Sequence, residues 1–143
     1  FNDKIIAFPI AISNNSEIST LNLSKVGFGA SGHSFNRKIT DSGNTFETHL
    51  KQGSICCSLD DVIGKFNILP NYIKIDTDGN ELKVLQGMKK TLSLDELKSI
   101  CIELNLNFDE HLESYNILKN SFKTYKKFEW YNGQDVFNYI FYR

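Results

Sequence analysis

The sequence predicts an α/β fold built around one mostly parallel sheet that ends in an antiparallel hairpin. Along the 143 residues, apolar strand-like runs alternate with segments of helical periodicity, and this alternation is typical of a parallel sheet with helices on both faces. The chain then ends in two aromatic-rich extended segments joined at Asn132-Gly133, a strong hairpin signal. With 41% hydrophobic residues, the chain can bury one sizeable core, so residues 1–143 are expected to form a single domain.

The first part of the chain is predicted to be mostly extended. Residues 4–12 are apolar and β-branched, as in a buried strand. Residues 18–23 alternate apolar and polar side chains, as in a strand that returns. Residues 25–44 are rich in glycine and serine, so they are predicted to form a long mobile loop. Residues 45–57 follow as one or two further strands.

Helices and strands alternate in the rest of the chain. Residues 58–66 are predicted to be helical, with Ser58 as the N-cap. A second helix is predicted over 79–92, with Asp78 as its N-cap and Glu81 completing a capping box. The remaining predicted elements are strands over 72–76 and 99–104, a helix over 109–120, and hairpin strands over 122–131 and 136–142.

Composition and charge exclude several classes of partner. The formal net charge is −1 and no basic block occurs, so nothing points to nucleic acid or an anionic membrane. No apolar run approaches the roughly 18 residues that span a bilayer. Cys56, Cys57 and Cys101 lack metal-binding or redox spacing, which predicts reduced thiols in a cytoplasmic protein that holds no metal.

Charged residues close two of the predicted strands. Asp76 ends the strand over 72–76, and Glu103 lies at the end of the next one. Ligands of open α/β sheets bind beyond the carboxyl ends of the strands, so a carboxylate here could attract a sulfonium cation or accept a proton from an attacking hydroxyl. The alternative is structural: Lys74 and Glu103 form an ion pair and Asp76 helps to cap the following helix.

The three histidines are isolated in the sequence, and each is expected at the surface. His33 is the most interesting of them because it lies in the glycine- and serine-rich loop, between Ser31 and Ser34. For a reaction in which an attacking hydroxyl must lose its proton, the candidate bases are Asp76, Glu103 and His33, in that order.

The sequence resembles the FkbM methyltransferase family at several places in the correct order. The most specific match is YIKIDTDGNELKVLQG at Tyr72–Gly87, which is similar to the family pattern lKIDv-G-E--vL-Ga. It is preceded by SLDD at Ser58–Asp61. Three shorter stretches support the match by position: AIS at 11–13, ICIEL at 100–104 and NYIFYR at 138–143. Thr77-Asp78 stands where many relatives have Val-Glu or Val-Gln, a mild departure.

This resemblance implies a Rossmann-like class I methyltransferase fold with S-adenosylmethionine as the cofactor. The acceptor would be a hydroxyl group on a sugar, a lipid or a secondary metabolite. By the same resemblance, Asp76 would lie nearest the transferred methyl group and Ser13 near the adenine. The loop with Ser31 and Ser34 would lie near the cofactor or the acceptor.

The resemblance also implies that part of the domain is missing from this sequence. Such folds hold the cofactor with a first strand, a glycine-rich loop and a second strand that ends in an acid, and none of these is found here. The chain is therefore expected to be the C-terminal portion of a methyltransferase domain, inactive alone. An unpaired sheet edge left by the missing strands would favour a homo-oligomer. The alternative is a non-catalytic α/β module that keeps the sheet and binds a partner or a glycan.

Overall fold

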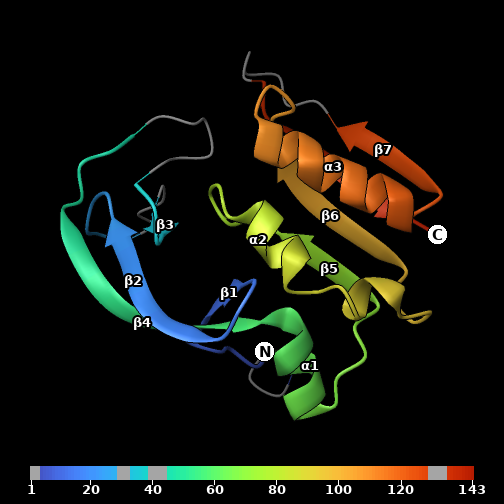
Figure 1. The fold of residues 1–143 in the computed structure, drawn as a ribbon, viewed down its shortest axis with the longest axis horizontal. Coiled ribbons are helices and arrows are strands. Elements are labelled where there is room, and N and C mark those ends of the chain that lie inside the picture. The colour runs from blue at the N-terminus through green and yellow to red at the C-terminus, as the bar shows by residue number, and fades with distance from the viewer. Residues whose placement is uncertain (1–3, 29–32, 39–44, 129–134) are drawn as a thin grey trace.

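The computed structural model describes residues 4–28, 33–38, 45–128 and 135–143, which form two four-stranded sheets with helices beside them (Figure 1). The first sheet has the order β1-β4-β2-β3, with strands at Ala11–Ser13, Leu50–Ser58, Glu17–Leu23 and Ser34–Phe35. The second has the order β5-β6-β8-β7, with strands at Tyr72–Ile75, Ser99–Leu104, Phe137–Tyr142 and Thr124–Phe128. The helices are α1 at Leu59–Phe66, α2 at Glu81–Gln86 and α3 at Asp109–Ser121, with a 3₁₀ turn, η1, at Thr91–Ser93.

The structure confirms a mixed α/β fold but has two mixed sheets in place of one mostly parallel sheet. Within the described residues, β1 with β4 and β5 with β6 are the parallel pairs, and the remaining ladders are antiparallel. Connection length explains this difference. The short turn from β1 to β2 leaves no room for a crossover helix, so β2 must run back along the sheet, whereas the parallel step from β5 to β6 is made through α2.

Several predicted elements have different bounds in the structure. The strand expected over 4–12 is reduced to β1 at Ala11–Ser13, and the strands expected over 45–57 become β4 at Leu50–Ser58. The loop expected over 25–44 contains β3, which pairs with β2; its residues 29–32 and 39–44 lie outside the described part of the chain, as does the predicted Asn132-Gly133 turn. The N-cap prediction for α1 is confirmed, because Ser58 Oγ accepts a hydrogen bond from the Asp61 N–H.

The prediction for the start of α2 was wrong. The N-cap is Asn80 and not Asp78, and α2 covers only Glu81–Gln86 before the chain turns into η1. Asp78 and Gly79 have positive φ angles of 47° and 91°. Because residues in the left-handed region cannot continue a right-handed helix, the helix begins two residues later than the capping pattern indicates.

The hydrophobic core lies between the second sheet and its helices. One face of β5, β6 and β8 contributes alternate apolar side chains, and α2, η1 and α3 cover that face (Figure 1). The fully buried hydrophobic members of this core are Leu85, Met88, Leu97, Ile100, Ile102, Leu104, Leu118 and Phe141. Ile12 and Leu59 of the first sheet and α1 pack against this core from outside.

A tight junction joins the two sheets where α2 ends. A Cβ atom placed on Gly87 would lie 2.0 Å from the carbonyl oxygen of Ser13, so only glycine allows this approach of the end of β1. Beside it, the Asp60 N–H donates to the Gly87 carbonyl at 3.0 Å. The Asp60 carboxylate accepts hydrogen bonds from the Lys90 and Thr91 N–H groups, each at 2.9 Å, and from the Thr91 hydroxyl at 2.6 Å. The start of α1 is thereby fixed to the start of η1.

We predict that Gly87→Ala destabilises the protein by about 1–3 kcal/mol, the usual range for a side chain forced into filled space. Urea denaturation would measure the change. Gly64→Ala is the matched control, because a Cβ atom at Gly64 in α1 meets nothing within 4 Å. Since alanine favours helices, that variant should be neutral or more stable by up to about 1 kcal/mol. Equal destabilisation of both variants would contradict the proposed close contact.

Candidate functional site

A cluster of polar side chains lies on the face of the second sheet that the helices leave uncovered. Lys74 and Asp76 extend from β5 and its end, Glu103 from β6 and Asn138 from β8. The Lys74 Nζ is 2.9 Å from Asn138 Oδ1 and 3.3 Å from Asp76 Oδ2. The Asn138 amide donates to Glu103 Oε1 at 3.3 Å. The structure therefore brings Asp76 and Glu103 together at one edge, as the sequence predicts.

This arrangement differs from both parts of the structural alternative, in which Lys74 forms an ion pair with Glu103 and Asp76 caps the following helix. Asn138 stands between Lys74 and Glu103 and hydrogen bonds with both. Asp76 does not cap α2, whose N-cap is Asn80. The Asp76 side chain is 57% exposed, so its carboxylate remains accessible to a ligand.

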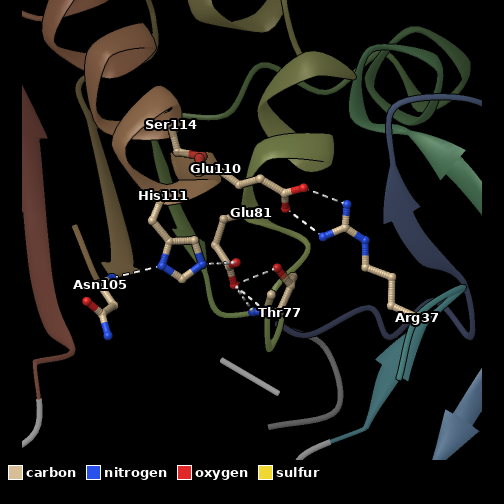
Figure 2. A network of polar contacts seen from close by, with 8 residues as sticks. Arg37, Thr77, Glu81, Asn105, Glu110, His111 and Ser114 are labelled. Atoms are coloured by element: carbon tan, nitrogen blue, oxygen red, sulfur yellow. Dashed lines mark hydrogen bonds and ion pairs between the residues drawn. The ribbon is translucent and has the colours of Figure 1, made fainter. Parts of the chain in front are cut away.

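A second, buried network lies directly behind the loop that follows Asp76 (Figure 2). Oε1 of Glu81 accepts from the Thr77 N–H at 3.2 Å, the Thr77 hydroxyl at 3.0 Å and the Gly79 N–H at 3.3 Å. Oε2 lies 3.2 Å from His111 Nε2, a close polar contact whose angles fall outside regular hydrogen-bond geometry. On the other side of the ring, the Asn105 N–H donates to His111 Nδ1 at 2.8 Å.

The charge of Glu81 is kept despite its burial. Burial alone raises the pKa of this carboxyl, since a charge is disfavoured away from water. The adjacent His111 ring, backbone N–H donors and the Thr77 hydroxyl act in the opposite direction and outweigh it, so the pKa of Glu81 lies below its usual value. The side chain is only 3% exposed, and the charge stabilises the loop rather than facing solvent.

Arg37 joins the first sheet to α3 beside this network. Its guanidinium donates two hydrogen bonds to the Glu110 carboxylate, at 2.6 and 2.8 Å (Figure 2). The Arg37 carbonyl also accepts from the Asn22 amide at 2.8 Å. Hydrogen bonding to Arg37 lowers the pKa of Glu110, as expected for a bidentate pair. The segment after β3 is thus attached to the first turn of α3.

The remaining predicted site residues lie outside the Asp76 cluster. Ser34 begins β3 of the first sheet and His33 precedes it, with His33 Nδ1 accepting from the Ser24 N–H at 3.4 Å. Ser34 is 1% exposed, and its hydroxyl has no hydrogen-bond partner among the described residues. Ser13 is buried at the end of β1, with its hydroxyl 3.3 Å from Asn14 Oδ1. Ser31 lies outside the described residues.

Sequence reasoning missed three residues of these networks. His111 was expected at the surface but is buried, because α3 turns it toward Glu81. Arg37 carried no signal, since its partner is 73 positions away. Asn138 carried a usable signal: a single asparagine inside an aromatic strand, NYIFY, requires polar partners across the sheet.

The described residues lack two kinds of feature, a membrane-spanning helix and a cluster of metal ligands. No helix in those parts of the chain is long and apolar enough to cross a membrane. Nor do His, Cys, Asp or Glu side chains gather there in groups of three or more that could hold a metal ion.

Fold and site together define a mixed α/β domain in which two adjacent parallel strands each have a carboxylate at the carboxyl end. The family model described as the methyltransferase FkbM domain matches residues 2–126. Because the match covers most of the chain, the protein belongs to the FkbM methyltransferase family. No curated protein and no solved structure matched the sequence.

We predict that acid destabilises the protein partly through Glu81. Because its pKa is lowered in the folded state from the ordinary value of 4.5, its charge contributes fully above that value. The contribution is lost as the pH falls through the lower, folded pKa. Glu81→Gln should reduce the free energy of unfolding at pH 7 by about 1–3 kcal/mol. In the acid range, the free energy of unfolding of this variant should depend less on pH than that of the wild type. Denaturation from pH 3 to 7 would measure both effects.

The control for this measurement is Glu113→Gln, an exposed position of α3, which should keep the wild-type pH profile. A Glu81→Gln profile that parallels the wild type would show that the buried carboxylate is not a source of the acid sensitivity.

Proposed function

We propose that this protein is part of an S-adenosylmethionine-dependent enzyme that methylates a hydroxyl group on a sugar, a lipid or a secondary metabolite. The observation that carries the proposal is the accessible Asp76 carboxylate at the end of β5, linked through Lys74 and Asn138 to Glu103 at the next strand. Membership in a methyltransferase family supports the reaction type. The parallel pairing of β5 with β6, joined through α2, is the kind of unit from which Rossmann-like folds are built, and it also supports the proposal.

The residues at this edge fit a cationic cofactor in part. S-adenosylmethionine supplies an electrophilic methyl group on a positively charged sulfur, and a carboxylate such as Asp76 favours a positive charge nearby. The Asp76 side chain is 57% exposed, so a ligand could reach it. Ser13 fits less well as an adenine contact, because its side chain is buried and turned toward Asn14.

Asp76 is also suited to act as the base. An acceptor hydroxyl must lose its proton as its oxygen attacks the methyl carbon, and a carboxylate within hydrogen-bond reach can take that proton. Lys74 lies 3.3 Å from Asp76 Oδ2 and forms an exposed ion pair with it. Asn138 holds Lys74 in this place. Glu103 is the second candidate for the same role.

We further propose that the chain forms the C-terminal portion of its domain. Among the described residues, β1 pairs on one side with β4 and β5 pairs on one side with β6. An apolar cavity of about 390 Å³ opens between these two strands and α1, with Ile10, Ile12, Val62 and Ile73 among its lining. Open strand edges beside apolar surface are typical sites for further strands. The missing cofactor strands and loop would fit this place.

We predict that Asp76→Asn in the complete enzyme lowers methyl-transfer turnover by about 10²-fold or more if Asp76 is the base. Asparagine keeps the shape but cannot take a proton. Its effect on stability should be small, because an exposed ion pair such as that with Lys74 contributes about 0–1 kcal/mol. Turnover and melting temperature would be measured on one preparation. Normal turnover would overturn the assignment, and Glu103→Gln would then be the next variant to examine.

We also predict that the 143-residue chain alone binds S-adenosylmethionine weakly or not at all, because it lacks the glycine-rich loop expected to hold the cofactor. Isothermal calorimetry is the test, and micromolar binding would show that the site is complete without that loop. In light scattering, the open edges of β1 and β5 should make the chain dimerise or aggregate. A stable monomer would argue against an incomplete sheet.

A further inference from the structure

The loop that carries Asp76 into α2 needs an external support. Two of its residues, Asp78 and Gly79, have left-handed φ angles of 47° and 91°. For Asp78 this conformation costs roughly 1–2 kcal/mol, and such conformations persist only when surrounding contacts impose them. The Oε1 atom of Glu81 supplies these contacts, since it accepts three hydrogen bonds from Thr77 and Gly79 on either side of Asp78.

Glu81 is itself oriented by a residue from another helix. The Asn105 N–H donates to His111 Nδ1, so that nitrogen carries no proton and Nε2 carries it. Nε2 is the atom that lies 3.2 Å from Glu81 Oε2. Both side chains are buried, at 8% and 3% exposure, so water does not replace these contacts. Asn105 directly follows β6, the strand that carries Glu103.

We propose that Glu81 and His111 are positioning residues for the candidate site. They connect the end of β6 through α3 and α2 to the backbone immediately after Asp76, and so fix the two strand ends that carry the carboxylates relative to each other (Figure 2). This inference rests on the proposed function only for its effect on catalysis. The structural part, that His111 acts on the loop through Glu81, stands independently.

Two substitutions of His111 separate its two contacts. The amide oxygen of asparagine reaches the place of Nδ1, so His111→Asn can still accept from the Asn105 N–H but has no donor for Glu81. The longer glutamine places its amide nitrogen near Nε2, so His111→Gln can still present an N–H group to Glu81 while losing the Asn105 bond. The matched control is Glu110→Gln, one residue earlier on α3, which weakens the Arg37 ion pair and leaves His111 intact.

Amide hydrogen exchange, followed by NMR on the protein, tests the structural part. In His111→Asn, the Thr77 and Gly79 amides should exchange at least about tenfold faster than in the wild type, while amides within β6 stay within about threefold. His111→Gln and Glu110→Gln should keep the wild-type exchange at Thr77 and Gly79. If His111→Asn does not fold, Glu81→Gln serves instead, because it removes the charge that these amides contact and should give the same local acceleration.

Two results would overturn the inference. One is that the Thr77 and Gly79 amides of His111→Asn, which lacks the His111–Glu81 contact, exchange at the wild-type rate. The other is that amide exchange becomes faster by the same factor in β6 and in the loop. Glu81 and His111 would then stabilise the core in general and not the loop in particular. In the complete enzyme, His111→Asn should lower kcat by about tenfold with His111→Gln close to the wild type. Because Asp76→Asn tests the proposed reaction and exchange tests the loop, failure of one is distinguishable from failure of the other.

Discussion

The arrangement of the whole chain depends on the junction where Gly87 meets the end of β1. The second sheet has a continuous core of its own, whereas among the described residues the first sheet contributes Ile12 to the edge of that core. The first sheet is therefore held mainly by specific contacts: the approach of Gly87 to Ser13, the hydrogen bonds around Asp60 and the Arg37–Glu110 ion pair. Close packing at one point takes the place of a shared core, so a single added methyl group at Gly87 is expected to destabilise the protein.

Polar groups in this protein are placed according to two different requirements. The Asp76 cluster lies on the uncovered sheet face, where solvent moderates the interaction of its charges. The Glu81 network lies behind it in the interior, where a charge is tolerated only when its partners surround it. The exposed cluster is available for chemistry, and the buried one supplies the rigidity that such chemistry requires. Glu81 links the two because it belongs to the interior but binds the backbone next to Asp76.

The stretches that resemble the family each have a physical reason in the fold. In SLDD, Ser58 caps α1 and Asp60 binds the start of η1. In the KID segment, Lys74 and Asp76 form the polar edge, and the later glycine, Gly87, allows the sheets to approach. In the final NYIFYR, Arg143 donates to the carbonyls of Leu92 and Leu94, closing the chain onto η1. These contacts join segments that are distant in the sequence, so the residues of the short motifs lie where separate elements of the fold contact one another.

The sequence alone determined that the fold is mixed α/β, the order of most helices and strands, the family, and the placement of Asp76 and Glu103 at the ends of neighbouring strands. These features depend on local periodicity and on the rule that parallel strands end at one edge. Only the tertiary structure decided that the strands divide into two mixed sheets, that α2 starts at Glu81, and that His111 is buried. Each of these depends on groups far apart in the chain, such as Asn105 and Glu81 on either side of one imidazole. Local sequence patterns do not predict such contacts, because these contacts form by packing between elements and not within a single element.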